Sequence, residues 1–592
     1  MNTQTAPTRE LTAEVAHEVA AEWLRNFEQA LDAGGPEALE ALFTETATWR
    51  DFMAFTWDVS NRIGRDPLVE RLSNWAGQVG PGDFALNPIQ DPVVFEAEKV
   101  QAFFEFTTSE RVDRGYALLV PEGDGFVCAM LQTQADGLRR FPELAGDNRA
   151  EGKVHGYVEN RTRWTSDREA EAAFEHSEPA AVVLGAGHNG LSVAARLKAL
   201  DVPTLVIDRE QRVGDQWRKR YAALALHSIL HVDHLPYLPF PKTWTAHTPK
   251  DKLADFLEYY VKALDLNVWT GTTFQDASYD EERQVWTIRV ERADGSIREI
   301  HPRHFVVTAG LNGPPKIPAV KGLENFEGEW AHSGEYQNAA DWAGKDVLVV
   351  GAGVSAHEMS HDLHEHGANV TMLQRGATYV VTFETFNKYW FGLYTEEQEL
   401  PIELADQVAY SAPNLIGDGI NKQLVELAKE EDKELLDALE ARGFKLEWGP
   451  DGTGIIGAHM MGRDSYQIDI GASALVADGR VKLKSGAELA EVKGKTAIFT
   501  DGSEADFDLI LFATGYEQLW DYMGPALGIA DKIPKVYGRA EDNEYANVWR
   551  RSAQPGLWFG TGFIGMARFH SKFMTLLIKA IEEGIAPFDP DK

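Results

Sequence analysis

Two stretches decide the fold of this chain: Ala181-Val-Val-Leu-Gly-Ala-Gly-His-Asn-Gly190 and Val347-Leu-Val-Val-Gly-Ala-Gly-Val-Ser-Ala356. In each, four apolar residues typical of a buried strand run directly into a glycine-rich turn. Such a turn lets the backbone approach a pyrophosphate closely, and the N-terminus of the following helix supplies unpaired N–H groups. One copy of this pattern is weak. Two copies predict two nucleotide sites, built on Gly185, Gly187 and Gly190 and on Gly351 and Gly353.

The residue that ends the next strand distinguishes the two sites. Asp208 ends the run Thr204-Leu-Val-Ile-Asp, and Gln374 ends Val370-Thr-Met-Leu-Gln at the same separation from its turn. An acid here can accept hydrogen bonds from both ribose hydroxyls of FAD or NAD. The second site has no acid, and Arg375 would tolerate or bind a 2′-phosphate, with a solvated strand-end charge as the alternative. We therefore predict FAD at the first site and NADPH, or else NADH, at the second.

Composition sets limits on partners and compartment. The 592 residues include 57 Lys and Arg against 92 Asp and Glu, a net charge of −35, which argues against nucleic acid or an anionic membrane as a partner. The chain shows no signal peptide, no apolar run of membrane-spanning length and no lipidation motif, so we expect a cytoplasmic protein.

The single cysteine excludes two kinds of redox chemistry. Cys128 lies far from both glycine turns, and one cysteine cannot form an internal disulfide. Disulfide reductases, which also pair FAD with NADPH, need a redox-active cysteine pair in the subunit or from a partner. A cysteine-ligated iron–sulfur cluster within the chain is excluded for the same reason.

From residue 177 onward strand and helix signals alternate, which predicts an α/β protein with two nested Rossmann-like dinucleotide-binding domains. The run Asp508-Leu-Ile-Leu-Phe-Ala-Thr-Gly-Tyr516 is expected to return the chain to the first domain. Both nucleotides should meet at the cleft outside the carboxyl ends of the strands. The expected segments are a linker over 149–176, the first part of the FAD domain over 177–336, the NAD(P)H domain over 337–507 and the closing part of the FAD domain over 508–592.

Residues 1–148 show an α+β pattern in place of a dinucleotide turn. A helical pattern runs from Val15 to about Leu42, and strand-like runs follow at 93–95, 101–106 and 116–120. This order resembles the SnoaL-like cone fold of the nuclear-transport-factor superfamily, whose members bind small ligands, catalyse isomerisation or dimerise. A pocket lined by Trp49, Asp51 and Trp57, with Asp51 as a base, is one interpretation. A packing module or a homodimer contact is the other, and is the one we favour.

The segment between the two nucleotide folds carries a family fingerprint. Phe326-Glu-Gly-Glu-Trp-Ala-His332-Ser-Gly-Glu-Tyr336 matches F-x-G-x-x-x-H-x-x-x-[WYF], so the chain resembles the class B flavoprotein monooxygenases. Tyr336 at the last position is similar to the flavin-containing monooxygenases, whereas Baeyer–Villiger enzymes have Trp followed by Pro or Asp. The resemblance implies that His332 has a structural and dynamic role, coupling the two domains to nicotinamide binding.

Further matches extend this resemblance over roughly residues 178–592. Ser355 completes the family's G-x-G-x-S turn, Gln216 and Trp217 lie in a segment similar to its G-G-x-W beside the flavin, Ala309 lies in the turn that closes the first FAD half, and Thr514 lies in its F-A-T-G-Y motif. By resemblance, these residues belong to the cofactor sites.

One departure from the family concerns the reaction. The run Tyr221-Ala-Ala-Leu-Ala-Leu-His227-Ser228 aligns with the segment whose asparagine lies near the flavin C4a, and this chain has His227 there. His227 and the N-terminal extension are similar to bacterial type II flavin-containing monooxygenases, which implies use of NADH and NADPH and oxidation of ketones. Other runs, Pro239-Phe-Pro and Leu257-Glu-Tyr-Tyr260 among them, resemble plant auxin-forming monooxygenases.

The family implies a reaction in which hydride reduces the flavin, O₂ adds at C4a, and the (hydro)peroxide transfers one oxygen atom to a small substrate. Ketones, sulfides and amines are the expected substrates, with oxidative decarboxylation of an α-keto acid as an alternative. We hypothesise that His227 influences the protonation state and hence the reaction, against simple packing. A flavin reductase or oxidase and a nucleotide-binding sensor are the rival functions. Aromatic residues that could line a pocket or simply pack are Phe383, Phe386, Tyr389, Trp390 and Tyr394.

Overall fold

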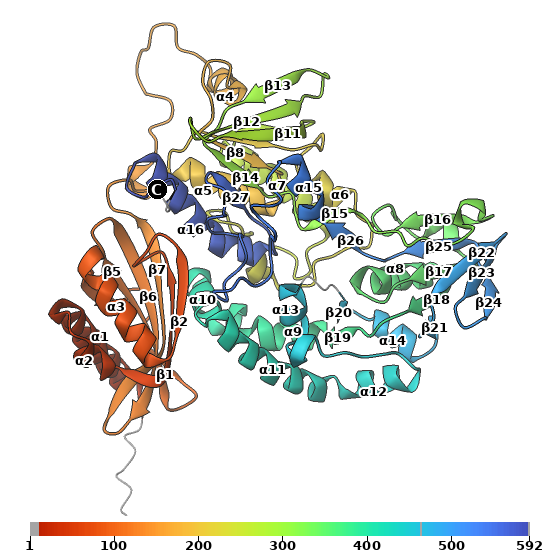
Figure 1. Ribbon diagram of the computed structural model, residues 1–592, viewed down its shortest axis with the longest axis horizontal. Helices are drawn as coiled ribbons and strands as arrows, with labels where there is room; N and C mark the ends of the chain where they lie inside the picture. Colours follow the sequence, from red (N-terminus) through yellow and green to blue (C-terminus); the bar gives the residue numbers. More distant parts are fainter. Residues whose placement is uncertain (1–10, 462–464, 590–592) are drawn as a thin grey trace, which may run out of the picture.

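The computed structural model describes residues 11–461 and 465–589. Figure 1 shows an N-terminal mixed sheet with its helices on one side, a central part around one parallel sheet, and a third part around a second parallel sheet. The first ten residues of the expected N-terminal domain lie outside the described residues.

The N-terminal part is a curved mixed sheet in the order β2-β1-β7-β6-β5-β3, with β4 paired to β5. Strands β1 and β7 are parallel, and the other pairs are antiparallel. The expected helix to Leu42 ends earlier, because Gly34 adopts a left-handed φ of 68°. The elements are α1 (Ala13–Ala33), α2 (Pro36–Glu40), β1 (Phe43–Phe52), β2 (Val59–Ile63), α3 (Arg65–Val79), β3 (Gly82–Leu86), β4 (Val93–Phe95), β5 (Lys99–Thr107), β6 (Arg111–Glu122) and β7 (Gly125–Leu138).

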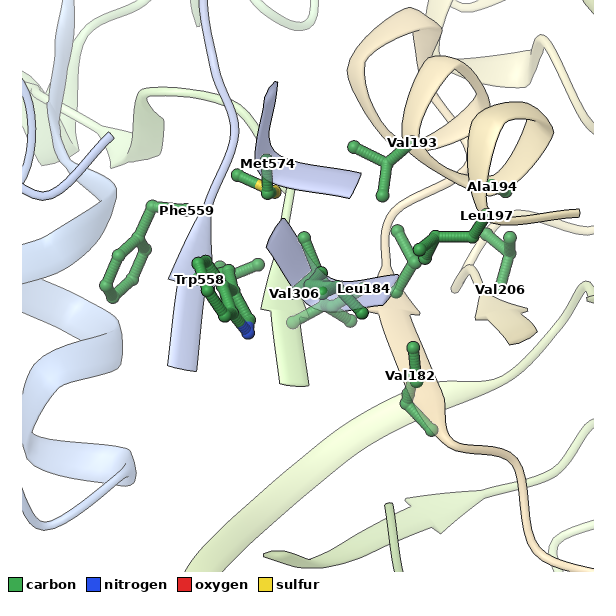
Figure 2. Close-up of a cluster of buried hydrophobic side chains, with 14 of the residues drawn as sticks. Val182, Leu184, Val193, Ala194, Leu197, Val206, Val306, Trp558, Phe559 and Met574 are labelled. Atoms are coloured by element: carbon green, nitrogen blue, oxygen red, sulfur yellow. The ribbon is translucent and has the colours of Figure 1, made fainter. Parts of the chain in front are cut away.

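The central part is built on a five-stranded parallel sheet in the order β10-β9-β8-β14-β27. These strands are apolar along their length because helices cover the sheet. Figure 2 shows side chains of β8, β14, β27 and α5 meeting in the core between the sheet and its helices. Its strands and principal helices are β8 (Ala181–Leu184), α5 (His188–Ala199), β9 (Thr204–Ile207), α6 (Asp215–Arg218), α7 (Lys250–Ala263), β10 (Val268–Trp269), β14 (His304–Val307), β27 (Leu557–Phe559) and α16 (Ile564–Glu582).

Smaller elements surround the central sheet. Helix α4 (Trp164–Ala173) interrupts the expected linker, and Arg168 fixes it by donating to Asn267 Oδ1 at 2.7 Å. Two further sheets, a three-stranded antiparallel sheet and a two-stranded ladder, are separate from the central one. Their strands are β11 (Thr273–Asp280), β12 (Val285–Glu291), β13 (Ile297–Ile300), β15 (Asn312–Pro315) and β26 (Tyr516–Gln518), and helix α15 (Leu519–Ala526) follows β26.

The third part is built on the parallel sheet β16-β25-β17-β18-β21. This order corrects one sequence-based expectation. The run at 509–512 does not return the chain to the first sheet; as β25 it pairs with β16 and β17, and the chain rejoins the first sheet only at β27. The elements are β16 (Glu329–His332), β17 (Asp346–Val350), α8 (Val354–Glu365), β18 (Asn369–Gln374), α14 (Ala472–Ala477), β21 (Lys482–Ser485), β22 (Leu489–Lys493), β23 (Thr496–Phe499), β24 (Glu504–Asp506) and β25 (Leu509–Phe512).

A mainly helical insertion leaves this sheet after β18. Figure 1 shows it running from the third part toward the N-terminal sheet. Its elements are β19 (Tyr379–Thr382), α9 (Phe383–Trp390), α10 (Ile402–Ala409), α11 (Asn414–Glu431), α12 (Lys433–Ala441), α13 (Gly454–Met460) and β20 (Tyr466–Asp469). Short 3-10 turns across the chain are η1 (Gly146–Asn148), η2 (Leu230–Asp233), η3 (Leu323–Asn325), η4 (Ala340–Trp342), η5 (Gly392–Tyr394), η6 (Glu396–Gln398) and η7 (Pro450–Gly452).

Among the described residues, none of these helices combines the length and apolar character that crossing a membrane requires.

Candidate functional site

The first glycine turn joins β8 to α5. Gly185 has a φ of 108°, and a Cβ there would lie 2.9 Å from the Thr308 carbonyl oxygen. A Cβ on Gly190 would lie 1.9 Å from the Gly185 carbonyl oxygen, so helix and strand approach too closely for any side chain. Gly187 differs, because its nearest neighbour would be Gln216 Nε2 at 3.6 Å. The first and third glycines serve packing, and the second keeps open space in front of the helix.

Helix α5 begins without a side-chain cap. Its N-cap is Gly187, and its first turn contains no acid. The first backbone N–H groups are therefore free to bind an anion such as a pyrophosphate. Gln216 reaches this turn by donating from Nε2 to the Ala186 carbonyl at 3.4 Å, and Trp217 packs against the same core. The structure thus brings the predicted Gln216 to the first turn, whereas Trp217 is placed against the core of the central part.

Asp208 lies at the end of β9, beside the turn. Its carboxylate accepts hydrogen bonds from the backbone N–H groups of Ala186, at 2.5 Å, and Glu210, at 2.8 Å. Burial raises the pKa of Asp208, against the lowering effect of these two bonds. Its side chain is only partly buried, so the remaining lone pairs can accept ribose hydroxyls.

The second turn repeats this geometry between β17 and α8. A Cβ on Gly351 would lie 2.3 Å from the Ala513 carbonyl oxygen. Gly353 is the N-cap of α8, again with no side-chain cap and no acid in the first turn. Ser355 lies in that turn and is partly exposed. The turn therefore has the same features for holding a pyrophosphate as the first.

The end of β18 separates Gln374 from Arg375. Gln374 is fully buried, donating from Nε2 to the Lys445 carbonyl at 2.9 Å and accepting at Oε1 from Lys445 N–H at 2.8 Å. Ser485 Oγ donates to the same Oε1 at 3.1 Å. Gln374 is thus occupied within the protein. Arg375 is 79% exposed, and its nearest acid is Glu488 at 4.0 Å, so its guanidinium is free for a phosphate.

His332 fastens β16 to the end of β25. Its Nδ1 accepts from the Gly334 N–H at 3.1 Å, so Nε2 carries the proton and donates to the Gly515 carbonyl at 2.9 Å. Burial lowers the pKa of His332, which keeps the ring neutral. Tyr336 extends the link to the second fold by donating to Asp362 Oδ2 of α8 at 2.5 Å. This geometry is that of a joint between segments.

His227 faces α8, the helix that begins at the second glycine turn. Its Nε2 lies 3.5 Å from Glu358 Oε1 of α8, the side chains being 13% and 4% exposed. Neither atom has a hydrogen-bond partner among the residues that the structure describes. The pair connects the segment after α6 with the helix that begins at the second glycine turn. Sequence reasoning missed Glu358, although a charge in the second turn of a sheet-packing helix was an available signal.

Other predicted residues are less informative. Ala309 is exposed at the end of β14, beside a small cavity of about 20 Å³ that includes Gly310 and Thr561. Thr514 lies in the turn after β25 and donates to the Lys316 carbonyl. The aromatic residues of the insertion largely pack: Phe386 stacks on Trp390 at 5.2 Å, and Tyr394 donates to Asp406.

In the N-terminal part, Asp51 is a structural residue. It is fully buried and accepts from the N–H groups of Ala54 and Phe55 and from Thr133 Oγ1. Trp49 donates to the same hydroxyl, whereas Trp57 stacks on Arg111. Burial raises the pKa of Asp51 to about 6. Asp51 is therefore not an accessible base, because its carboxylate is fully buried and bonded to the protein's own donors; this contradicts the pocket interpretation, which was the less favoured of the two.

Comparisons with known proteins place the chain in a family. The family model for pyridine nucleotide-disulphide oxidoreductases matches residues 182–401. Indole-3-pyruvate monooxygenase YUCCA1 of Oryza sativa subsp. japonica is 32% identical over 340 residues, which are 57% of this chain and 77% of the relative. The chain belongs to the class B flavin monooxygenases. A second flavin monooxygenase, the probable indole-3-pyruvate monooxygenase YUCCA3 of Arabidopsis thaliana, is 32% identical over 63% of this chain and 80% of its own.

Solved structures of flavin monooxygenases share the fold. The ε-caprolactone-bound crystal structure of cyclohexanone monooxygenase matches with a TM-score of 0.50 and 18% identity, over 69% of this chain and 88% of that one. A mutant cyclohexanone monooxygenase from Rhodococcus sp. Phi1 bound to NADP⁺ also scores 0.50, at 16% identity over 69% and 86%. The chain is an NAD(P)H-dependent flavin monooxygenase with FAD and NADP as cofactors. Its two capless helix N-termini and crowded glycine turns fit those groups.

Proposed function

We propose that this flavin monooxygenase inserts one oxygen atom into a small carbonyl substrate, with sulfides and amines as secondary substrates. FAD is held by Gly185, Gly187 and Gly190, by Asp208 at the ribose, and by Gln216, Trp217, Ala309 and Thr514 along the same cleft. NADPH is held by Gly351, Gly353 and Ser355 at the pyrophosphate, with Arg375 at the 2′-phosphate. NADH is the alternative donor, because Arg375 is the only contact proposed to distinguish the two.

The contact between His227 and Glu358 carries this proposal. Both groups are buried, 3.5 Å apart, and otherwise unpartnered at the facing atoms. Glu358 lies on α8, the helix that follows β17 and the second glycine turn, and ligands of such folds bind outside the carboxyl ends of the parallel strands. When bound, the flavin accepts hydride from the nicotinamide and activates O₂.

The protein itself must determine, at the site of His227 and Glu358, whether the reacting oxygen carries a proton. Attack on a carbonyl carbon requires an oxygen nucleophile without its proton, whereas transfer to sulfur or nitrogen requires the proton to remain. An imidazole N–H can donate a hydrogen bond to an oxygen anion. His227, whose Nε2 faces Glu358 Oε1, is therefore suited to hold negative charge on oxygen by hydrogen bonding, which favours carbonyl substrates. His332 serves as a joint and takes no part in the chemistry.

An α-keto acid is a second candidate substrate. The plant relatives reported above are indole-3-pyruvate monooxygenases, and indole-3-pyruvate is an α-keto acid. Its reaction also begins at a ketone carbonyl, so the same proton control applies. Cyclic ketones, which would undergo Baeyer–Villiger oxidation, and α-keto acids are therefore two branches of one proposal.

The test is product analysis with coupling. Cyclic ketones, indole-3-pyruvate, sulfides and amines are each incubated with NADH or NADPH, and product, O₂ and hydrogen peroxide are measured together. We expect one NADPH and one O₂ per oxygenated product from at least one carbonyl compound. NADPH oxidation that yields only peroxide with every substrate would mean a reductase or oxidase instead.

The variant His227→Asn tests the role of the histidine. We expect ester or acid products to fall about tenfold relative to sulfoxide, since a positioned proton-controlling group typically contributes at least that factor. His247→Asn is the control, because His247 lies against Phe383 at 5.2 Å and outside the proposed proton contact. An unchanged product ratio in His227→Asn would refute the role assigned to His227.

A further inference from the structure

The N-terminal part is attached to the flavoprotein through the outer face of its sheet. Its helices pack on the other face, where Trp23, Phe27 and Phe104 form the core. On the outer face Phe103 and Tyr116 pack with Leu404 of α10 in the insertion. In Figure 1 the sheet stands beside α10 and α16. The interface therefore joins three sections of the chain: the N-terminal sheet, the insertion that contains α10, and the C-terminal section that contains α16.

Arg50 of β1 connects the N-terminal sheet to both other sections. It is 2% exposed and forms a two-pronged ion pair with Glu544, from Nε at 3.1 Å and from Nη2 at 2.6 Å. Its Nη1 donates to the carbonyls of Tyr410 and Ala412 at 3.1 Å each, just beyond the end of α10. A buried arginine whose donors are satisfied in this way holds its partners in one arrangement.

A second polar contact reaches α10 from the same sheet. Gln407 Nε2 donates to Gln132 Oε1 of β7 at 2.8 Å, and both side chains are buried. The N-terminal sheet thus fixes α10 along its length and at its end.

The opposite side of α10 points toward the flavoprotein. Asp406 accepts two hydrogen bonds from Arg568 of α16, at 2.8 and 2.6 Å, and one from the Tyr394 hydroxyl at 2.7 Å. Arg568 also donates from Nη1 to the carbonyls of Val232 and His234, at 2.7 and 2.9 Å. Helix α10 therefore controls the arginine that holds the segment following His227.

Two more contacts lead from this segment back to His227. Ser228, its neighbour in the chain, donates to Asp233 Oδ2 at 2.6 Å. The Ile229 N–H donates to Asn387 of α9 at 3.2 Å. A contiguous set of buried polar contacts thus runs from Arg50 to the residue next to His227.

We propose that the N-terminal part braces the active site, and that Arg50 and Gln132 are positioning residues for the segment 227–234. They act through α10, Asp406 and Arg568. Without the brace α10 shifts, Arg568 loses its fixed partner, and the proton contact of His227 is no longer held. This inference concerns the position of the segment and does not depend on the substrate class.

The chain offers a matched control for simple attachment. Arg550 donates to Asp58 Oδ2 at 2.7 Å, which also ties the N-terminal part to the flavoprotein. Among the described residues, Asp58 forms hydrogen bonds only with Arg550 and with its chain neighbours Thr56 and Val59. Arg550 also donates to Asp542, whose carboxylate accepts from the Glu544 N–H. The control therefore changes Asp58 alone and leaves Arg550 in place. If the N-terminal part only needs to stay attached, the two pairs should be equivalent.

The experiment compares FAD-loaded full-length variants. Arg50→Met with Glu544→Gln removes both buried charges together, which avoids leaving one unpaired. Gln132→Leu is an independent, milder variant, and Asp58→Asn, which weakens the other tie between the N-terminal part and the flavoprotein, is the control. Hydrogen–deuterium exchange is followed over 402–412 and 227–234, together with hydrogen peroxide released per NADPH oxidised.

We expect exchange in both segments to rise roughly tenfold or more in the Arg50 variant, since a lost charged hydrogen bond corresponds to at least that factor. Gln132→Leu should show a smaller rise in both segments, and peroxide per NADPH should increase in both variants. The control should leave all three readouts at their wild-type values. Wild-type exchange over 227–234 in the Arg50 variant, or equal effects in the control, would overturn the proposal.

Discussion

At the end of β18, Arg375 is the side chain that we propose to bind the 2′-phosphate. The Gln374 amide is hydrogen bonded to the backbone of Lys445, whereas Arg375 is 79% exposed and its Nε lies 4.0 Å from Glu488 Oε1. For Arg375→Ala we predict a fall of roughly tenfold in kcat/KM for NADPH and little change for NADH, because only the phosphate contact is lost. Steady-state kinetics with both donors measure this.

The acid beside Arg375 supplies the matched control. Glu488→Gln removes an anion that competes with the phosphate for Arg375 in an exposed pair. It should therefore leave kcat/KM for NADH unchanged and raise kcat/KM for NADPH by no more than about twofold. If Arg375→Ala impairs NADH as strongly as NADPH, the guanidinium does not recognise the phosphate.

Asp233 makes stability depend on pH. Burial raises its pKa to about 7 from an ordinary 3.8, against the effects of Ser228 and Arg568. The folded state therefore keeps a proton that the unfolded chain releases, and stability falls as pH rises between these values. Asp233→Asn cannot titrate. The free energy of unfolding of Asp233→Asn, relative to that of the wild type, should therefore increase by roughly 2 kcal/mol between pH 5 and pH 8. The Tm of the variant minus that of the wild type should increase with pH over the same range.

Ser228→Ala is the control for this effect. It removes the hydroxyl that lowers the pKa of Asp233 but leaves the titrating group in place. Its pH dependence should therefore be at least as steep as that of the wild type. A difference in Tm between Asp233→Asn and wild type that does not vary with pH would contradict the raised pKa.

Local spacing explains which site residues the sequence could predict. The glycines, Asp208 and Arg375 are defined by their distance along the chain from a buried strand, so they can be read from the sequence. Glu358 could not be paired with His227 in this way, because 131 positions separate them and only the packing of α8 brings them together. For Asp51 the sequence left a base and a packing residue open, because one of its hydrogen-bond partners, Thr133, lies on another strand.

At the scale of elements, the first turn predicts two different outcomes for one substitution. A Cβ at position 190 would lie 1.9 Å from a carbonyl oxygen, so Gly190→Ala should separate α5 from β8 and abolish folding or soluble expression. At position 187 the backbone is extended and the nearest atom lies at 3.6 Å. Gly187→Ala should fold with a Tm close to that of wild-type apoprotein and bind FAD at least tenfold more weakly, measured by flavin fluorescence titration.

Strand pairing is the part of the fold that the sequence left open. The apolar runs at 304–307 and 509–512 look alike, and each is buried on both faces. Periodicity identifies them as strands but cannot assign them to a sheet, because the pairing partners are distant in the chain. This is why β25 was expected in the first sheet and lies in the second, where it pairs with β16 and β17.

At the scale of the whole molecule, the interface predicts cooperative unfolding. Phe52 at the end of β1 is fully buried between Phe569 and Phe573 of α16, with ring centroids 5.0 Å from each. Together with Arg50 and Glu544, it makes the N-terminal part and the central part share one core. We expect the wild-type holoenzyme to show one calorimetric transition in which flavin release and loss of N-terminal structure coincide.

Phe52→Ala should divide this transition. Removing a buried phenyl ring lowers stability by about 3–5 kcal/mol. Here the loss should weaken mainly the interface between the two parts and not the core beneath α1 and α3. The N-terminal part should then unfold at a lower temperature than the flavin-binding sheet, giving two calorimetric peaks of which only the second releases FAD. Phe84→Ala, in the core under α1, should instead destabilise the N-terminal part from within. A single peak for Phe52→Ala, shifted downward with FAD release still coincident, would show that contacts other than the aromatic core maintain the coupling.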